Sequence, residues 1–149
     1  MNTFEQGPGQ NIAGLNEIRF SKLSQEEQVK AVEEGKKPIA TASVLLETSL
    51  SHIETIIPLV NFERRGGKEI ATQIRNQTDY IYYRPDQEFN AHRMRRMMED
   101  YCAELSKVKV GDELPPAPKG PEQTAYHREI GKLLGYSDAE IEEFVKNYR

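Results

Sequence analysis

The sequence is poor in the features that mark secreted, membrane-spanning and disulfide-rich proteins. It has a single cysteine, Cys102, so no disulfide can form within the chain. It has no tryptophan, and no apolar run approaches the roughly 18 residues of a membrane span. The first ten residues lack the cationic start and the apolar stretch of a signal peptide. These absences predict a cytoplasmic protein without a membrane partner.

Charge is balanced along the chain. The 149 residues include 20 Lys and Arg against 24 Asp and Glu, a net charge of −4. Nucleic-acid-binding proteins are usually basic, so this balance argues against a nucleic-acid partner. Hydrophobic residues make up 37% of the chain, above the range of disordered sequences. We expect a flexible N-terminal arm over residues 1–16 and a single globular domain over residues 17–149.

A capping box and a glycine delimit the first predicted helix, over residues 25–34. Ser24 and Glu27 form the S-x-x-E pattern, in which each side chain bonds the backbone amide of the other residue. Gly35 follows where a left-handed cap is favoured at the end of a helix. A later helix is expected from Asp86, as its cap, to about Val108.

Residues 39–63 are ambiguous between helix and strand. Apolar residues recur along this region at helical spacing, which favours a helix with a kink near Pro58. The alternative is a strand followed by a short helix that starts at Ser51. Residues 68–83 repeat the ambiguity, because their isoleucines share a helical stripe while DYIYY (79–83) has strong strand propensity.

The C-terminal segment AYHREIGKLLGYSDAEIEEFVKN (125–147) predicts a helical hairpin, with a second capping box at Ser137 and Glu140. The segment resembles one in small uncharacterised bacterial families, where His, Glu-Ile-Gly and Leu-Gly-Tyr-Pro precede a helix that ends near Phe. The chain departs from that pattern at Ser137, where the families have proline. It also departs at His127, which stands one residue further from Glu129. The resemblance implies no activity, cofactor or binding residue.

Together these elements predict a mainly α fold, a single domain of about five helices that ends in a helical hairpin. The alternative is an α+β fold with a small sheet built from residues 39–47 and 70–83. Within the helical fold, the stretch NFERRGGKEI (61–70) is interpreted as the corner between two helices. The position just after a helix favours glycine, and arginines in the last turn of the helix complement its dipole.

The same stretch has a functional interpretation as an anion site. A Walker-type phosphate loop is excluded, because the two glycines are adjacent and Glu69 follows the lysine. A looser site remains, in which arginine forks bind phosphate or carboxylate. It combines Arg64, Arg65 and Lys68 with the Gly67 amide, and a second cationic cluster around residues 84–96 would strengthen it if the fold brought the two face to face. The candidate ligand-binding residues are Arg64, Arg65, Lys68, Arg84, His92 and Arg96.

No pattern in the sequence specifies catalysis, and we expect no metal or cofactor. The three histidines lack a His or Cys partner at helical zinc spacing. We therefore predict a non-enzymatic interaction or regulatory protein that acts through a protein partner or as a homo-oligomer. Seven tyrosines and four methionines supply contact surface. The alternative is a binder of a small anion such as a nucleotide. A third hypothesis is an enzyme with His127 or His92 as its general base.

Overall fold

A computed structural model describes residues 20–118 and 120–147, so the predicted arm over residues 1–16 lies outside the described residues. Within those ranges a three-stranded antiparallel sheet, in the order β1-β3-β2, combines with four α-helices. The strands are β1 (Ile39–Ala42), β2 (Ser51–Arg65) and β3 (Lys68–Tyr83). The helices are α1 (Gln25–Glu33), α2 (Glu88–Tyr101), α3 (Pro121–Leu133) and α4 (Asp138–Asn147). None of these helices is both long and apolar enough to cross a lipid bilayer.

The prediction of a mainly α fold with about five helices is wrong, and the class is α+β. Residues 39–63 form β1, a loop and β2, and residues 68–83 form β3. Pro58 does not interrupt β2, because an edge strand tolerates a proline whose missing N–H faces away from the sheet. The alternative sheet from residues 39–47 and 70–83 included two of the three strands and missed β2.

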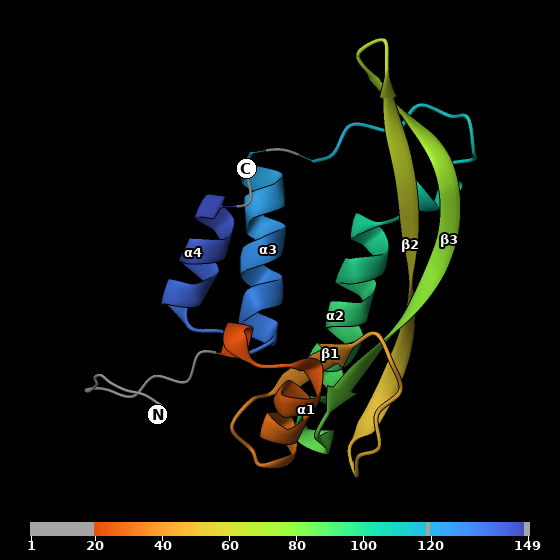
Figure 1. Cartoon of the computed structure of the whole chain (residues 1–149). Helices are drawn as coiled ribbons and strands as arrows, with labels where there is room; N and C mark the ends of the chain where they lie inside the picture. The colour runs from red at the N-terminus through yellow and green to blue at the C-terminus, as the bar shows by residue number, and fades with distance from the viewer. Residues whose placement is uncertain (1–19, 119, 148–149) are drawn as a thin grey trace.

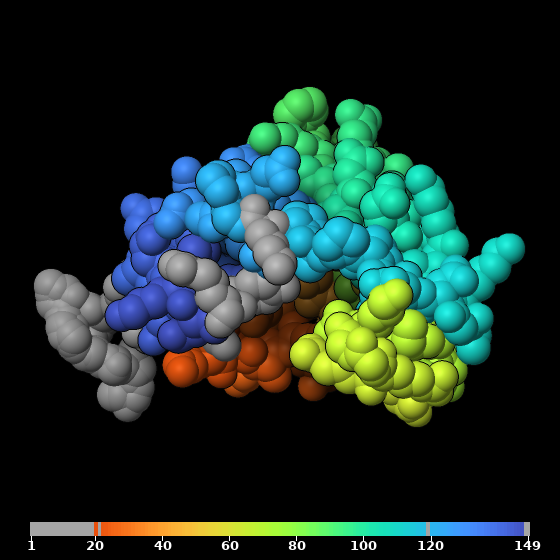
Figure 2. All heavy atoms as spheres, turned by 90° about the horizontal axis from the view of Figure 1, so that it is seen from above, coloured from red at the N-terminus to blue at the C-terminus, as the bar shows by residue number. Residues whose placement is uncertain are grey.

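The β2–β3 hairpin is the longest feature of the molecule. It forms one side of the structure, α3 and α4 form the opposite side, and α2 lies between them (Figure 1). The tip of the hairpin extends beyond the ends of the helices. Figure 2 looks down on this tip, in yellow, and shows it on the side away from the blue α3 and α4.

The hydrophobic core lies at the base of the hairpin, where β1 adds a third strand. One cluster joins the sheet to α2 and to the end of α3, and its buried members are Ile39, Ile81, Tyr83, Ala91, Met94, Leu133 and Leu134. A second cluster joins the other face of the sheet to α1, and its buried members are Val29, Val32, Ala40, Ala42 and Tyr82. Neither cluster includes a residue between positions 54 and 79, although Thr55, Pro58 and Ala71 are buried individually in that part of the hairpin.

The first helix agrees with its prediction. The Glu27 amide donates to Ser24 Oγ at 3.1 Å, and the Ser24 amide donates to the Glu27 carboxylate at 2.8 Å. Gly35 has the positive φ, +78°, that the predicted cap requires.

The predicted bounds of the next helix are wrong. It begins at Glu88 after a 3₁₀ turn, Pro85–Gln87, and no side chain caps it. Asp86 instead lies 3.6 Å from Arg84 Nε. The helix ends at Tyr101, and a separate 3₁₀ turn, Leu105–Lys107, replaces its predicted last turns.

The C-terminal helical hairpin is confirmed as α3 and α4. The Glu140 amide donates to Ser137 Oγ at 3.2 Å, and the Ser137 amide donates to the Glu140 carboxylate at 3.1 Å. Gly135, between the two helices, has φ +83°, and a Cβ there would lie 2.4 Å from Pro38 Cδ. Glycine is therefore required both for the backbone turn and for the close approach of this hairpin to the start of β1.

Candidate functional site

The stretch NFERRGGKEI forms the tip of the β2–β3 hairpin, so its interpretation as a corner between helices is wrong. Arg65 and Lys68 face each other across a two-residue turn made by Gly66 and Gly67. The two glycines have φ values of +56° and +81°. Two successive positive φ values are typical of a type I′ turn, whose twist matches that of the strands.

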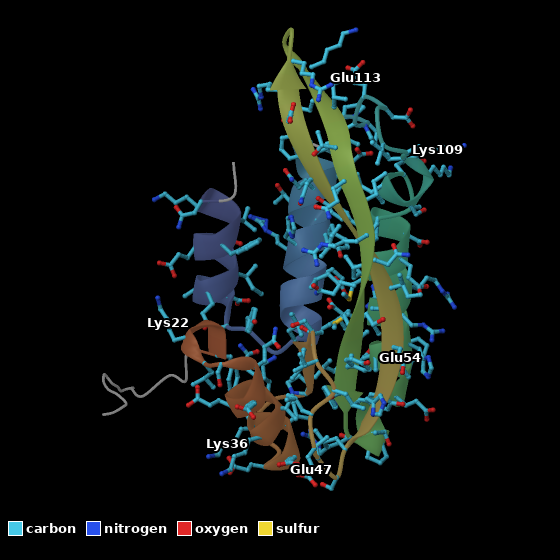
Figure 3. The ribbon with its side chains drawn as sticks, turned by 45° about the vertical axis from the view of Figure 1, so that its right-hand side comes forward. Lys22, Lys36, Glu47, Glu54, Lys109 and Glu113 are labelled. Atoms are coloured by element: carbon cyan, nitrogen blue, oxygen red, sulfur yellow. The ribbon has the colours of Figure 1, made fainter. Side chains whose placement is uncertain are left out.

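The cations at the tip are exposed and already paired with carboxylates. The pairs are Arg64–Glu69 at 2.8 Å, Arg65–Glu63 at 2.9 Å and Lys68–Glu113 at 3.8 Å. Glu113 reaches the tip from the segment after α2 and lies beside it in Figure 3. Each positive charge at the tip therefore has a neutralising neighbour within 4 Å.

The other candidate ligand-binding residues lie at the opposite end of the hairpin. Arg84 follows β3 and has a structural role, because its Nη1 donates to Val32 O at 2.6 Å and to Lys37 O at 2.9 Å. His92 and Arg96 are on α2, away from the tip. The 16 residues of β3 rise about 3.3 Å each, which places roughly 50 Å between Lys68 and Arg84. Helix α2 runs back along β2, where Thr55 Oγ1 donates to Glu99 at 3.2 Å, ten residues before the tip of the strand. The structure does not bring the six side chains to one site.

Lys37 is the most unusual charged residue of the described part, and sequence patterns did not identify it. Its side chain is only 1% exposed, and its Nζ donates to Ile39 O at 2.6 Å and to Leu134 O. The Tyr136 ring centroid lies 4.9 Å from the same atom. Burial lowers the pKa of Lys37 to about 7, and the nearby Glu140 carboxylate offsets this only in part. Lys37 thus ties the start of β1 to the α3–α4 hairpin.

An apolar cavity of about 230 Å³ lies between α3 and α4. Tyr136, His127 and Glu140 are among the residues that line it. Burial raises the pKa of Tyr136 and lowers that of His127, which favours the neutral form of both side chains. In residues 20–118 and 120–147, no cluster of His, Cys, Asp or Glu is arranged to hold a metal ion.

The outer edge of β2 is the open edge of the sheet. The type I′ turn makes Arg65 and Lys68 a hydrogen-bonded pair, and such pairs alternate along antiparallel strands. The odd-numbered residues of β2 therefore direct their N–H and C=O groups to β3, and the even-numbered residues direct theirs outward. On β3, Ala71 lies opposite Phe62, and its amide donates outward to Asp112 O at 2.9 Å, as this alternation requires.

No backbone hydrogen bond from the described residues reaches the outward groups of β2. Pro58 is itself an outward position, so its missing N–H removes no bond to β3. Beside this open backbone, Ile56 is 58% exposed and Phe62 is 49% exposed. The sequence did not predict this edge, because the apolar spacing of residues 39–63 favoured a helix. Reading every second residue from 54 to 64 (E-I-P-V-F-R) would have revealed an apolar row with charged ends.

Comparison with known proteins adds no relative: no protein-family model matches the sequence, and neither a curated protein nor a solved structure matches it.

Proposed function

We propose that this chain is a cytoplasmic, non-enzymatic interaction protein that binds another polypeptide along the outer edge of β2. The observation that supports the proposal most is the length of that edge. A 15-residue strand presents along one side N–H and C=O groups that pair with no backbone group of residues 20–118 and 120–147. Such an edge is a template for an added strand, which gains main-chain hydrogen bonds and pockets for alternate side chains.

The exposed side chains next to the edge support the same function. Ile56 and Phe62 are large apolar residues on a strand whose neighbouring core clusters stop at the base of the hairpin. An added strand would cover these side chains and pair the backbone in one step. Cys102, the single free thiol, suits a reducing compartment, and burial raises its pKa, which disfavours a nucleophilic role.

The anion-binding hypothesis has weaker support. A site with all six candidate residues needs the two cationic clusters face to face, and the length of β3 separates the tip from Arg84. The tip cations already have carboxylate partners, and Arg84 is committed to two backbone carbonyls. Strand addition at β2 requires no rearrangement of these contacts.

The test replaces Phe62 with a photo-crosslinking phenylalanine in cells that express the chain. Phe89 is the matched control, because it is 80% exposed but lies on α2, away from the edge. We expect a discrete cross-linked product from position 62 and none from position 89. Adding Ile56→Pro should abolish the product, since it removes an outward N–H without removing a bond to β3. The proposal fails if the two positions cross-link equally or if the product survives Ile56→Pro.

A further inference from the structure

We infer that the strand added to the outer edge of β2 is β2 of a second copy of this chain, in one antiparallel register centred on Leu59. The inference rests on the proposed function and names its partner. It is carried by the order of the outward residues of β2, which are Glu54, Ile56, Pro58, Val60, Phe62 and Arg64.

In antiparallel pairing about a two-fold axis at Leu59, each outward residue meets a complementary one. Glu54 faces Arg64 of the second copy, and the opposite charges form a pair at each end of the interface. Ile56 faces Phe62 of the second copy, an aromatic and β-branched combination that is favourable across strands. Pro58 and Val60 face each other nearest the axis, so the apolar pairs lie inside the charged ones.

The backbone supports the same register. Even-numbered residues of β2 direct their N–H and C=O groups outward, and a centre at Leu59 pairs even residues only with even residues. From Glu54 to Arg64, six such pairs supply about ten hydrogen bonds across the axis once the two missing proline donors are subtracted. Leu59 then meets its own copy in a pair without hydrogen bonds, where the side chains approach most closely.

Neighbouring registers lose this complementarity. A centre at Pro58 places Glu54 against Phe62 of the second copy and sets the two prolines against each other, so that pair has no donor at all. A centre at Val60 places Ile56 against Arg64 of the second copy. A register displaced by one residue pairs even-numbered residues with odd-numbered ones. The outward N–H and C=O groups of one strand then face residues of the second copy whose groups point to its own β3, so no hydrogen bonds form. Only the centre at Leu59 matches charge, apolar surface and backbone together.

The charged residues are available for this pairing. Glu54 is exposed, forms no ion pair within residues 20–118 and 120–147, and lies in the lower half of β2, far from the tip (Figure 3). Arg64 is 74% exposed in its side chain and holds Glu69 through Nη2 only. The planar guanidinium has further donors, so it can bind a second carboxylate on its free side.

The test is analytical ultracentrifugation of the purified full chain and of three charge variants. We expect the wild type, 17.1 kDa per chain, to sediment as a dimer. Glu54→Arg and Arg64→Glu each put like charges opposite each other at both ends, which should weaken the dimer at least about tenfold. The double variant restores opposite charges at both ends and should restore the dimer.

The decisive arm mixes the two single variants. In their heterodimer, the arginine introduced at position 54 of one copy meets the glutamate introduced at position 64 of the other, and the second end keeps its native pair. The mixture should therefore dimerise at concentrations where each variant alone is mainly monomeric. Glu47→Arg, an exposed acid in the loop before β2, is the control and should sediment as the wild type. Circular dichroism of each variant checks that the hairpin is folded.

Three results would overturn the inference: a monomeric wild type at all concentrations, single variants that dimerise as the wild type does, or a mixture that stays monomeric. A monomeric wild type whose position 62 cross-links to a different protein leaves the proposed function standing and excludes self-pairing. A monomeric wild type that gives no cross-link from position 62 contradicts both.

Discussion

The two outer edges of the β2–β3 hairpin differ in how they are closed. The outer edge of β3 is paired at its base with β1 and at its tip with the segment around Asp112, through Ala71 and Glu69. The outer edge of β2 has no strand beside it in the described part of the chain. One hairpin thus carries an edge that the fold covers at both ends and an edge where only Pro58 and the register shift between Asn61 and Phe62 disturb the strand. Since natural proteins usually cover or pair long edges, we interpret the uncovered edge as the interaction surface.

The largest expected difference between the two edges is in the free energy of unfolding. Ala40 lies on β1, is 0% exposed and helps to close β3, so Ala40→Glu buries a carboxylate in the core. We expect this change to cost at least about 3 kcal/mol or to prevent folding. Ile56→Glu introduces the same side chain at an exposed position of β2 and should cost less than about 1 kcal/mol in the dilute monomer. Urea unfolding of both variants measures the difference, and equal losses would contradict the comparison.

A pH dependence should arise at the protected side, where Lys37 ties β1 to the α3–α4 hairpin. Its pKa is about 7 in the folded chain and near the ordinary 10.5 when unfolded. Between these values the unfolded chain binds more protons, so stability should rise with pH from about 7 to about 10, by up to about 1.4 kcal/mol per pH unit. Below pH 7 both states are protonated and this contribution is constant.

Lys37→Met removes the titrating group while keeping an unbranched side chain of similar length. We expect urea unfolding of this variant to lose the rise in stability between pH 7 and 10. An unchanged rise in the variant would show that the pH dependence comes from another group.

The turn at the tip gives a smaller effect, because it acts on both edges at once. Gly66 has φ +56°, and a Cβ built on it meets no atom within 4 Å, so the constraint is purely conformational. Gly66→Val should cost about 1–2 kcal/mol, while Gly66→Asn should be nearly neutral, because Asn-Gly is favoured in type I′ turns. Thermal unfolding of the two variants tests this, and equal losses would argue against the I′ turn.

The smallest effect is expected where the segment after α2 protects the tip of β3. Asp112 Oδ2 accepts from the Lys109 amide at 3.0 Å, and Asp112 O accepts from the Ala71 amide. Asp112→Ala should loosen this turn by about 1 kcal/mol and speed hydrogen exchange of the Ala71 amide by roughly fivefold. The Tyr80 and Tyr82 amides, which face β1, serve as internal controls and should not change.

The outcome of the sequence predictions follows from the range of the interactions that decide each element. The capping boxes at Ser24 and Ser137 act within four residues, and both helices form where those boxes predicted them. Residues 39–63 have apolar spacing compatible with helix or strand, and pairing with β3 decides between the two. The GKKP sequence likewise does not show which lysine is buried, because the carbonyl of Leu134 reaches Lys37 from 97 residues away.

The candidate site was missed for a related reason. The cations of the RRGG stretch suggested an anion site. In the structure their partners are carboxylates of the same hairpin and of the segment after α2. Every second residue of β2 from Glu54 to Arg64 belongs to the outward row, which has charged ends and an apolar middle. This alternation indicates an edge only once the segment is known to form a strand. Which groups of that strand remain unpaired depends on the whole sheet.

The most direct test of the open edge is hydrogen exchange of the outward amides of β2 as a function of protein concentration. The amides are those of Glu54, Ile56, Val60, Phe62 and Arg64, and the inward amides of Ile53 and Thr55 are the reference. We predict fast exchange of the outward set in dilute protein, and progressive protection as concentration rises and β2 pairs with its copy. Exchange of the outward amides that stays fast at every concentration would contradict self-pairing, and protection already complete in dilute monomer would contradict the open edge itself.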